Sequence, residues 1–65
     1  MFKKYPDEEP YYNGVRYLTI VKIYNEYLYA FKRFNDDCEW ELEEGVEVVA
    51  FTELDPKKIY ESLIN

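Results

Sequence analysis

The chain has 65 residues, of which 48% are apolar and thirteen are aromatic, so it forms one small domain with a core rather than a disordered tail. Its formal charge of −6 disfavours direct nucleic-acid binding, which requires a basic face. The absence of histidine, the single cysteine and the lack of an apolar run of about 18 residues exclude a histidine-based catalytic site, an internal disulfide and a membrane-spanning helix.

Residues 1–14 are predicted to form an irregular arm. Pro6 and Pro10 interrupt regular structure, and Asn13-Gly14 is a turn signal. The first residues contain no apolar stretch of the kind found in signal peptides. A cytoplasmic location is therefore expected.

Residues 15–52 are predicted to form an antiparallel sheet of four strands connected as a meander, either open or curled into a small barrel. β-Branched and aromatic residues indicate the first two strands, and Asn25-Glu26 predicts a two-residue hairpin turn. Strict alternation from Cys38 to Leu42 predicts the third strand. The four strands are expected at Val15–Tyr24, Tyr27–Phe34, Cys38–Leu42 and Val46–Thr52.

Residues 55–64 are predicted to form one short C-terminal helix, which makes the whole chain a single β-rich α+β domain. Asp55 is a good N-cap, and Pro56 suits the first helical position. The apolar side chains of the helix follow one stripe, formed by Ile59, Tyr60, Leu63 and Ile64. This stripe is expected to pack on the sheet.

The predicted strand register sorts the side chains into two faces. It places Tyr24 opposite Tyr27, Phe34 opposite Cys38 and Leu42 opposite Val46, and side chains then alternate with a period of two. One face, here called the core face, receives Tyr17, Val21, Ile23, Leu28, Ala30, Phe34, Cys38, Trp40, Leu42, Val46 and Val48. The other, here called the outer face, receives the apolar residues Leu18, Ile20, Tyr24, Tyr27, Tyr29, Phe31, Val49 and Phe51, with charged residues around them.

No catalytic or metal-binding site is predicted. Cys38 is expected on the core face as a buried packing residue rather than a nucleophile. Asp36-Asp37 near Glu39 lack the spacing of a calcium loop and are expected to be a solvated loop. The protein is therefore predicted not to be an enzyme and to use no cofactor or metal.

Acidic residues dominate the second half of the chain. Residues 1–34 carry six basic and four acidic side chains, whereas residues 35–65 carry two basic and ten acidic ones. The candidate partner-binding acids are Asp36, Asp37, Glu39, Glu41, Glu43, Glu44 and Glu47. The predicted register sets Glu41 opposite Glu47 and Arg33 opposite Glu39. Two interpretations stay open: a solvated sheet edge whose charges deter aggregation, or a negative surface that docks on a basic one.

Four aromatic residues of the predicted hairpin are candidate contact residues. Tyr24, Tyr27, Tyr29 and Phe31 lie on the outer face, where an ordinary meander is polar. Tyrosine gives a large contact area at a low entropic cost. Contact with a partner or a second copy is one interpretation; cover by the N-terminal arm, or enclosure in a barrel, is the other.

The residues Tyr17-Leu18-Thr19-Ile20-Val21-Lys22, the lone Trp40, and Val48-Val49-Ala50-Phe51-Thr52-Glu53-Leu54 resemble a group of short phage and prophage proteins that share a domain of unknown function. The likeness spans about residues 6–56. Phe51 stands where that pattern has Trp, and Asp55-Pro56 replaces its Pro-Glu. The resemblance implies a phage or mobile-element origin and a small β fold, and it supplies no catalytic residues.

Three functions are compatible with these features. The first is a phage-type accessory protein that binds, and inhibits or redirects, a host protein with a basic surface in the bacterial cytoplasm, for example at a nucleic-acid-binding site of that protein. The second is a structural homo-oligomer, such as a homodimer, that packs through its tyrosine-rich sheet face. The third is a module for a nucleotide-like small ligand, with Arg16, Lys22 and Arg33 as a basic rim.

Overall fold

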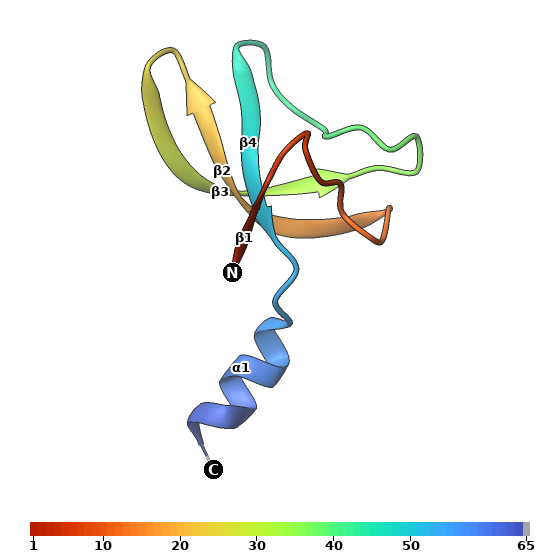
Figure 1. Ribbon diagram of the computed structural model, residues 1–65, viewed down its shortest axis with the longest axis vertical. Helices are drawn as coiled ribbons and strands as arrows, with labels where there is room; N and C mark the ends of the chain where they lie inside the picture. Colours follow the sequence, from red (N-terminus) through yellow and green to blue (C-terminus); the bar gives the residue numbers. More distant parts are fainter. Residues whose placement is uncertain (65) are drawn as a thin grey trace.

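The computed structural model describes residues 1–64 as one four-stranded antiparallel sheet followed by a short helix (Figure 1). The elements are β1 (Phe2–Lys4), β2 (Val15–Ile23), β3 (Glu26–Phe34), β4 (Val46–Thr52) and α1 (Pro56–Leu63). The strands lie in the order β1-β4-β2-β3, and every neighbouring pair is antiparallel. The predicted fold class is confirmed. The sheet is strongly curved but not closed, so it is not a barrel.

The meander connection predicted for the sheet is wrong, because its third strand does not form. Residues 38–42 make one isolated bridge, between Phe34 and Trp40. Asn35 explains the difference: its Oδ1 accepts the backbone N–H groups of Asp37 and Glu39, and its carbonyl accepts that of Cys38. These local bonds compete with a strand ladder.

The place beside β4 is taken by a segment that was expected to be irregular. Phe2–Lys4 forms β1 and pairs with β4, with Phe2 opposite Thr52. On its other side β4 pairs with β2, with Leu18 opposite Thr52. The first and last strands of the chain are thus neighbours, and the rest of the arm crosses over the sheet.

The hairpin between β2 and β3 turns one residue earlier than predicted. Tyr24 and Asn25 form the turn, with Tyr24 at a φ of 57°, and Ile23 pairs with Glu26. Val21 consequently lies opposite Leu28 instead of Ala30. A shift of two residues in pairing keeps every side chain of these strands on the face that was predicted.

A bulge in β4 moves Phe51 to the opposite face from the one predicted. Ile20 pairs with Ala50 but Val21 pairs with Val48, which leaves Val49 as the extra residue. Beyond the bulge the alternation is inverted, so Phe51 lies opposite Thr19 on the core face and is 0% exposed. The outer face therefore loses one of its predicted rings.

The core is built on the core face of the sheet and is covered by the arm and by the loop between β3 and β4. Its buried residues are Tyr17, Thr19, Val21, Phe34, Val48 and Phe51. The Trp40 ring lies over them, with ring centroids 4.9 Å from Phe34 and 6.0 Å from Phe51. Tyr5 of the arm packs on Trp40 at 5.8 Å. Cys38 was expected in this core but is exposed at a φ of 61°, because the Asn35 turn directs it outward.

Helix α1 forms as predicted but does not pack on the sheet. Asp55 caps it by accepting the Lys57 N–H at 3.0 Å, and Pro56 occupies the first turn. None of its residues is buried, and it extends away from the sheet (Figure 1). The expected docking site is occupied, because Trp40 and Tyr5 already cover the core face.

Candidate interaction surface

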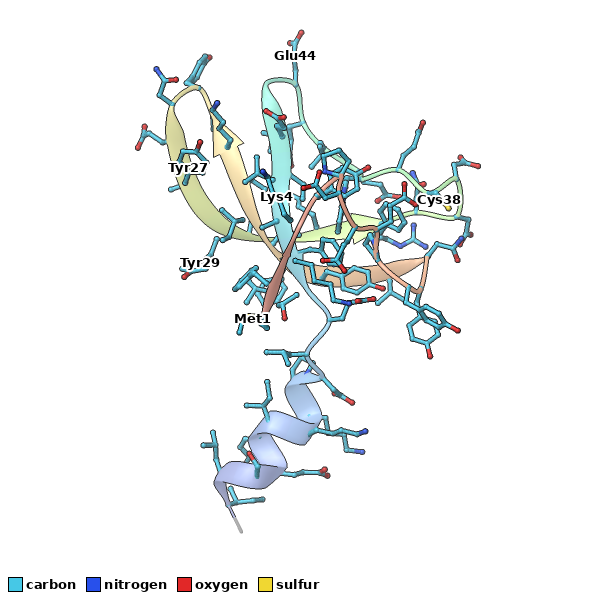
Figure 2. All side chains as sticks on the ribbon, viewed as in Figure 1. Met1, Lys4, Tyr27, Tyr29, Cys38 and Glu44 are labelled. Atoms are coloured by element: carbon cyan, nitrogen blue, oxygen red, sulfur yellow. The ribbon has the colours of Figure 1, made fainter. Side chains whose placement is uncertain are left out.

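The four aromatic residues predicted to contact a partner are all exposed. Tyr24, Tyr27, Tyr29 and Phe31 expose between 62% and 88% of their surfaces. Tyr27, Tyr29 and Phe31 alternate along β3 on the outer face, and Tyr24 lies in the adjoining turn. We call these four residues the ring surface; Figure 2 shows Tyr27 and Tyr29 on the outside of the hairpin.

The N-terminal arm leaves the ring surface largely uncovered. Phe2 reaches Tyr29, with ring centroids 6.1 Å apart, and Lys22 Nζ lies 5.9 Å from the centroid of Tyr27. The other arm rings go elsewhere: Tyr5 packs on Trp40, and Tyr12 bonds through its backbone to the Tyr17 hydroxyl. Among residues 1–64, these rings are therefore neither buried by the arm nor enclosed in a closed barrel.

A groove of about 630 Å³ adjoins the ring surface where the sheet meets the helix. Leu18 and Phe31 line it from the sheet. Apolar residues of the linker and of α1 form the opposite wall: Leu54, Pro56, Ile59, Tyr60 and Leu63. The sequence predicted the apolar stripe of the helix but not this groove, because the stripe was expected to be buried on the core face.

Two of the seven candidate acids are neutralised within the chain. Glu43 accepts Lys32 Nζ at 2.7 Å, and Glu41 accepts Arg33 Nη1 at 2.9 Å. The hydrogen bond from Lys32 holds the pKa of Glu43 below its usual range. The predicted pairing of Glu41 with Glu47 is wrong, because the missing third strand leaves Glu47 opposite Lys22. For the same reason Arg33 meets Glu41 rather than Glu39.

The other five acids divide into two groups. Asp36, Asp37 and Glu39 are exposed in the loop around Cys38, whereas Glu44 and Glu47 are exposed at the start of β4. Figure 2 shows Glu44 at the top and Cys38 at the right of the part that contains the sheet. The first group is extended by the arm: the pKa of Tyr5 is raised by burial and, in addition, by the negative charges of Glu9 and Glu39. These five acids thus form two separate negative groups.

Glu53 connects the arm to the segment that leads into the helix. Its carboxylate accepts Lys3 Nζ at 2.5 Å and the backbone N–H of Tyr11 at 2.6 Å. The bond from Lys3, and next the one from Tyr11, hold the pKa of Glu53 below its usual value. The same pairing raises the pKa of Lys3. Glu53 also lines the groove, so this contact helps to position its wall.

Acidification should weaken the fold through Glu53. Because its pKa is lowered by folding, this carboxylate stabilises the protein above its unfolded value of about 4.5, and the contribution is lost as the pH falls through the lower folded pKa. Lys3, whose pKa is raised, stays protonated throughout this range. We expect the melting temperature to fall from about pH 6 to about pH 3, and to fall less steeply in Glu53→Gln.

Glu43→Gln is the matched control for this titration. Glu43 also has a lowered pKa, but its side chain is 68% exposed against 20% for Glu53. Solvent screening makes exposed pairs weak. An equal loss of pH dependence in both variants would contradict the structural role assigned to Glu53.

Three further observations concern chemistry and membranes. Among residues 1–64, no group of three or more Cys, Asp or Glu side chains is gathered closely enough to hold a metal ion. Ser62 Oγ donates to the Ile59 carbonyl, and Asn13 Nδ2 lies 3.7 Å from Cys38 Sγ. In the same part of the chain, no helix has the length and apolar character needed to cross a bilayer.

Comparison of the chain with protein families, with curated proteins and with solved structures finds no match.

Proposed function

We propose that the protein is a small phage-type accessory protein that binds a host protein and thereby inhibits or redirects it. The exposed ring surface is the observation that supports this proposal. Aromatic residues are enriched among the few side chains that dominate binding energies. Exposed clusters of them on a folded chain commonly mark contact sites. In this protein they lie on a regular hairpin, which presents them with little loss of backbone entropy on binding.

The charge of the protein suggests the character of the partner. Asp36, Asp37, Glu39, Glu44 and Glu47 are exposed and take part in none of the ion pairs found in residues 1–64. Carboxylates of this kind accelerate docking on a basic surface and suppress other partners. A host protein with a nucleic-acid-binding channel offers such a surface, where carboxylates would take the places of phosphates. The proposed location is the bacterial cytoplasm.

The proposal is tested by capturing host proteins with matched baits. Wild-type protein, Glu44→Lys/Glu47→Lys and Asp7→Lys/Glu8→Lys are immobilised and exposed to a bacterial lysate at low and high salt. The two double variants carry the same change in net charge, but the second changes the arm. Each captured protein is then purified, and its affinity for the three baits is measured together with its competition by duplex DNA.

We expect one captured protein to bind the wild type and the arm variant, and to bind the Glu44→Lys/Glu47→Lys variant about tenfold more weakly at low salt, with a flatter salt dependence. Tyr27→Ser/Phe31→Ser should weaken the same complex at every salt concentration, because hot-spot rings contribute about 2 kcal/mol or more each. Equal binding to all baits would overturn the proposal.

The groove favours a second candidate function, the binding of a small aromatic ligand. Its volume of about 630 Å³ falls within the range of ligand sites, roughly 300–1,000 Å³. Arg16 is at its edge, but so are Glu53 and Asp55, while Lys22 and Arg33 of the predicted basic rim do not line it. A thermal-shift series of nucleosides and nucleotides tests this function. A stabilisation that disappears in Tyr60→Ser supports it, and no shift at millimolar ligand contradicts it.

A further inference from the structure

Strand β3 lies at the edge of the sheet, and most of its outer side is unpaired among residues 1–64. Its C-terminal end is covered by the loop that follows: the Glu41 N–H donates to the Arg33 carbonyl, and Phe34 forms a bridge with Trp40. From Glu26 to Lys32 no described strand lies on that side. The open edge is therefore seven residues long, and Tyr29 is its midpoint.

The direction of the backbone groups along this edge follows from two hydrogen bonds. The Phe34 carbonyl accepts the Gly14 N–H on the side of β2, whereas the Arg33 carbonyl accepts the Glu41 N–H on the opposite side. The pairing of β3 with β2 is uninterrupted from Glu26 to Phe34, so this alternation continues along the strand. Tyr27, Tyr29 and Phe31 therefore direct their N–H and C=O groups away from the sheet.

The sequence of the open edge is nearly symmetric about Tyr29. In an antiparallel pair of two such strands centred on that residue, Tyr29 lies opposite Tyr29 of a second copy. Tyr27 then lies opposite Phe31, Leu28 opposite Ala30, and Glu26 opposite Lys32. Rings meet rings on the outer face, and opposite charges meet at both ends. A two-fold interface requires this kind of self-complementarity.

We propose that two copies of the chain associate by pairing β3 with β3 in this register, which joins their sheets into one of eight strands. The residues with outward backbone groups are the ones that face one another, so the pairs at 27, 29 and 31 each exchange two hydrogen bonds. Lys32, already bonded to Glu43, would receive Glu26 of the second copy as an additional partner.

The edge lacks the features that usually prevent such pairing. Between Glu26 and Lys32 there is no proline, no bulge and no charge other than the two complementary end residues. Tyr27, Tyr29 and Phe31, each at least 62% exposed, together offer roughly half of the about 800 Å² per partner of a standard interface. A dimer that dissociates in the micromolar range is expected, and it does not depend on the proposed host partner.

The register is tested by disulfide formation in a Cys38→Ser background. Residues directly opposite in a hydrogen-bonded antiparallel pair have Cα atoms about 5.5 Å apart, within the range of a disulfide. Tyr29→Cys should therefore cross-link to itself under mild oxidation. Tyr27→Cys and Phe31→Cys should each form no disulfide when oxidised alone, because equal residues would be about 13 Å apart, but should cross-link to each other when mixed. Tyr24→Cys, at the turn, is the control and should not cross-link.

Sedimentation equilibrium and amide hydrogen exchange of the unmodified protein provide a second test that needs no variant. We expect a monomer–dimer equilibrium at micromolar concentrations. The amides of Tyr27, Tyr29 and Phe31 should become protected as concentration rises, while those of Leu28, Ala30 and Lys32 are protected throughout by β2. If the protein stayed monomeric at all concentrations and these three amides stayed unprotected, the proposal would be overturned. The edge of β3 would then be available to pair with a strand of a different protein. A dimer that cross-links in another register would overturn it as well.

Discussion

Replacement of Phe51 by alanine is expected to remove a large fraction of the stability of the protein. The ring is 0% exposed, lies opposite Thr19 on the core face and packs against Tyr17 and Trp40. Deleting a buried phenylalanine ring costs about 3–5 kcal/mol. A domain of this length has only about 3–10 kcal/mol of stability, so the loss is a large fraction of the total. Urea denaturation followed by far-UV circular dichroism measures the effect.

Phe31→Ala is the matched control, because it deletes the same side chain from the other face. Phe31 is 64% exposed, and surface substitutions usually change stability by about 0.5 kcal/mol or less. The contrast between the two variants tests the bulge at Val49 directly. Without that bulge Phe51 would lie on the outer face beside Phe31, and the two substitutions would have similar small effects.

Trp40→Ala should be the second severe variant. The indole packs against Tyr5, Tyr17, Phe34 and Phe51 and is the main contact between the loop and the core face. Its removal should cost about 3–5 kcal/mol and release both the loop and the arm. Thermal melting and the exchange of the Tyr5 amide, which donates to the Val49 carbonyl, measure the two effects.

Trp40→Phe separates the packing of this side chain from its polarity. Trp40 Nε1 is buried and has no hydrogen-bond partner among residues 1–64. A buried donor without a partner costs about 1–3 kcal/mol. Phenylalanine removes that cost together with part of the packing, so the net loss should be small compared with alanine. If both variants were equally destabilised, the indole N–H would have to be bonded in solution.

Most of the features that depend on neighbouring residues were predicted correctly from the sequence, although the hairpin turn lies one residue earlier than predicted. The two long strands, the hairpin between them and the assignment of their side chains to faces follow from alternation alone. The helix follows from the Asp55 cap and Pro56, whose effects are confined to one turn. The sequence also showed that the chain has more rings than its core can enclose, but it left open whether the arm or a barrel covers Tyr27 and Tyr29, which the structure shows to be exposed.

The errors arise where distant segments compete for the same partner. An alternating stretch at 38–42 is suited to a strand, but Asn35 satisfies the local backbone and Phe2–Lys4 takes the place beside β4. The extra residue at Val49 leaves no local signal, and it reverses the faces of the residues that follow. The helix was predicted to cover the core face, but Trp40 covers that face, and the helix therefore does not pack on the sheet.

The candidate site shows the same division between local and distant effects. Its rings were identified from the hairpin turn and β3 alone. The groove combines β2, β3, the linker and α1, so it could not be predicted before their arrangement was known. The division of the seven acids into two ion-paired residues and two exposed groups likewise depends on contacts such as Arg33 with Glu41.

The sequence by itself determined the class of fold, the identity of the hairpin and the excess of rings over core volume, because each is a property of composition or of residues a few positions apart. Only the tertiary structure decided the order of the strands, the side of the sheet to which Phe51 points and the part of β3 that is left open. The physical reason is that strand pairing and core cover are choices among distant segments, settled by which combination satisfies the most backbone groups and buries the most apolar surface.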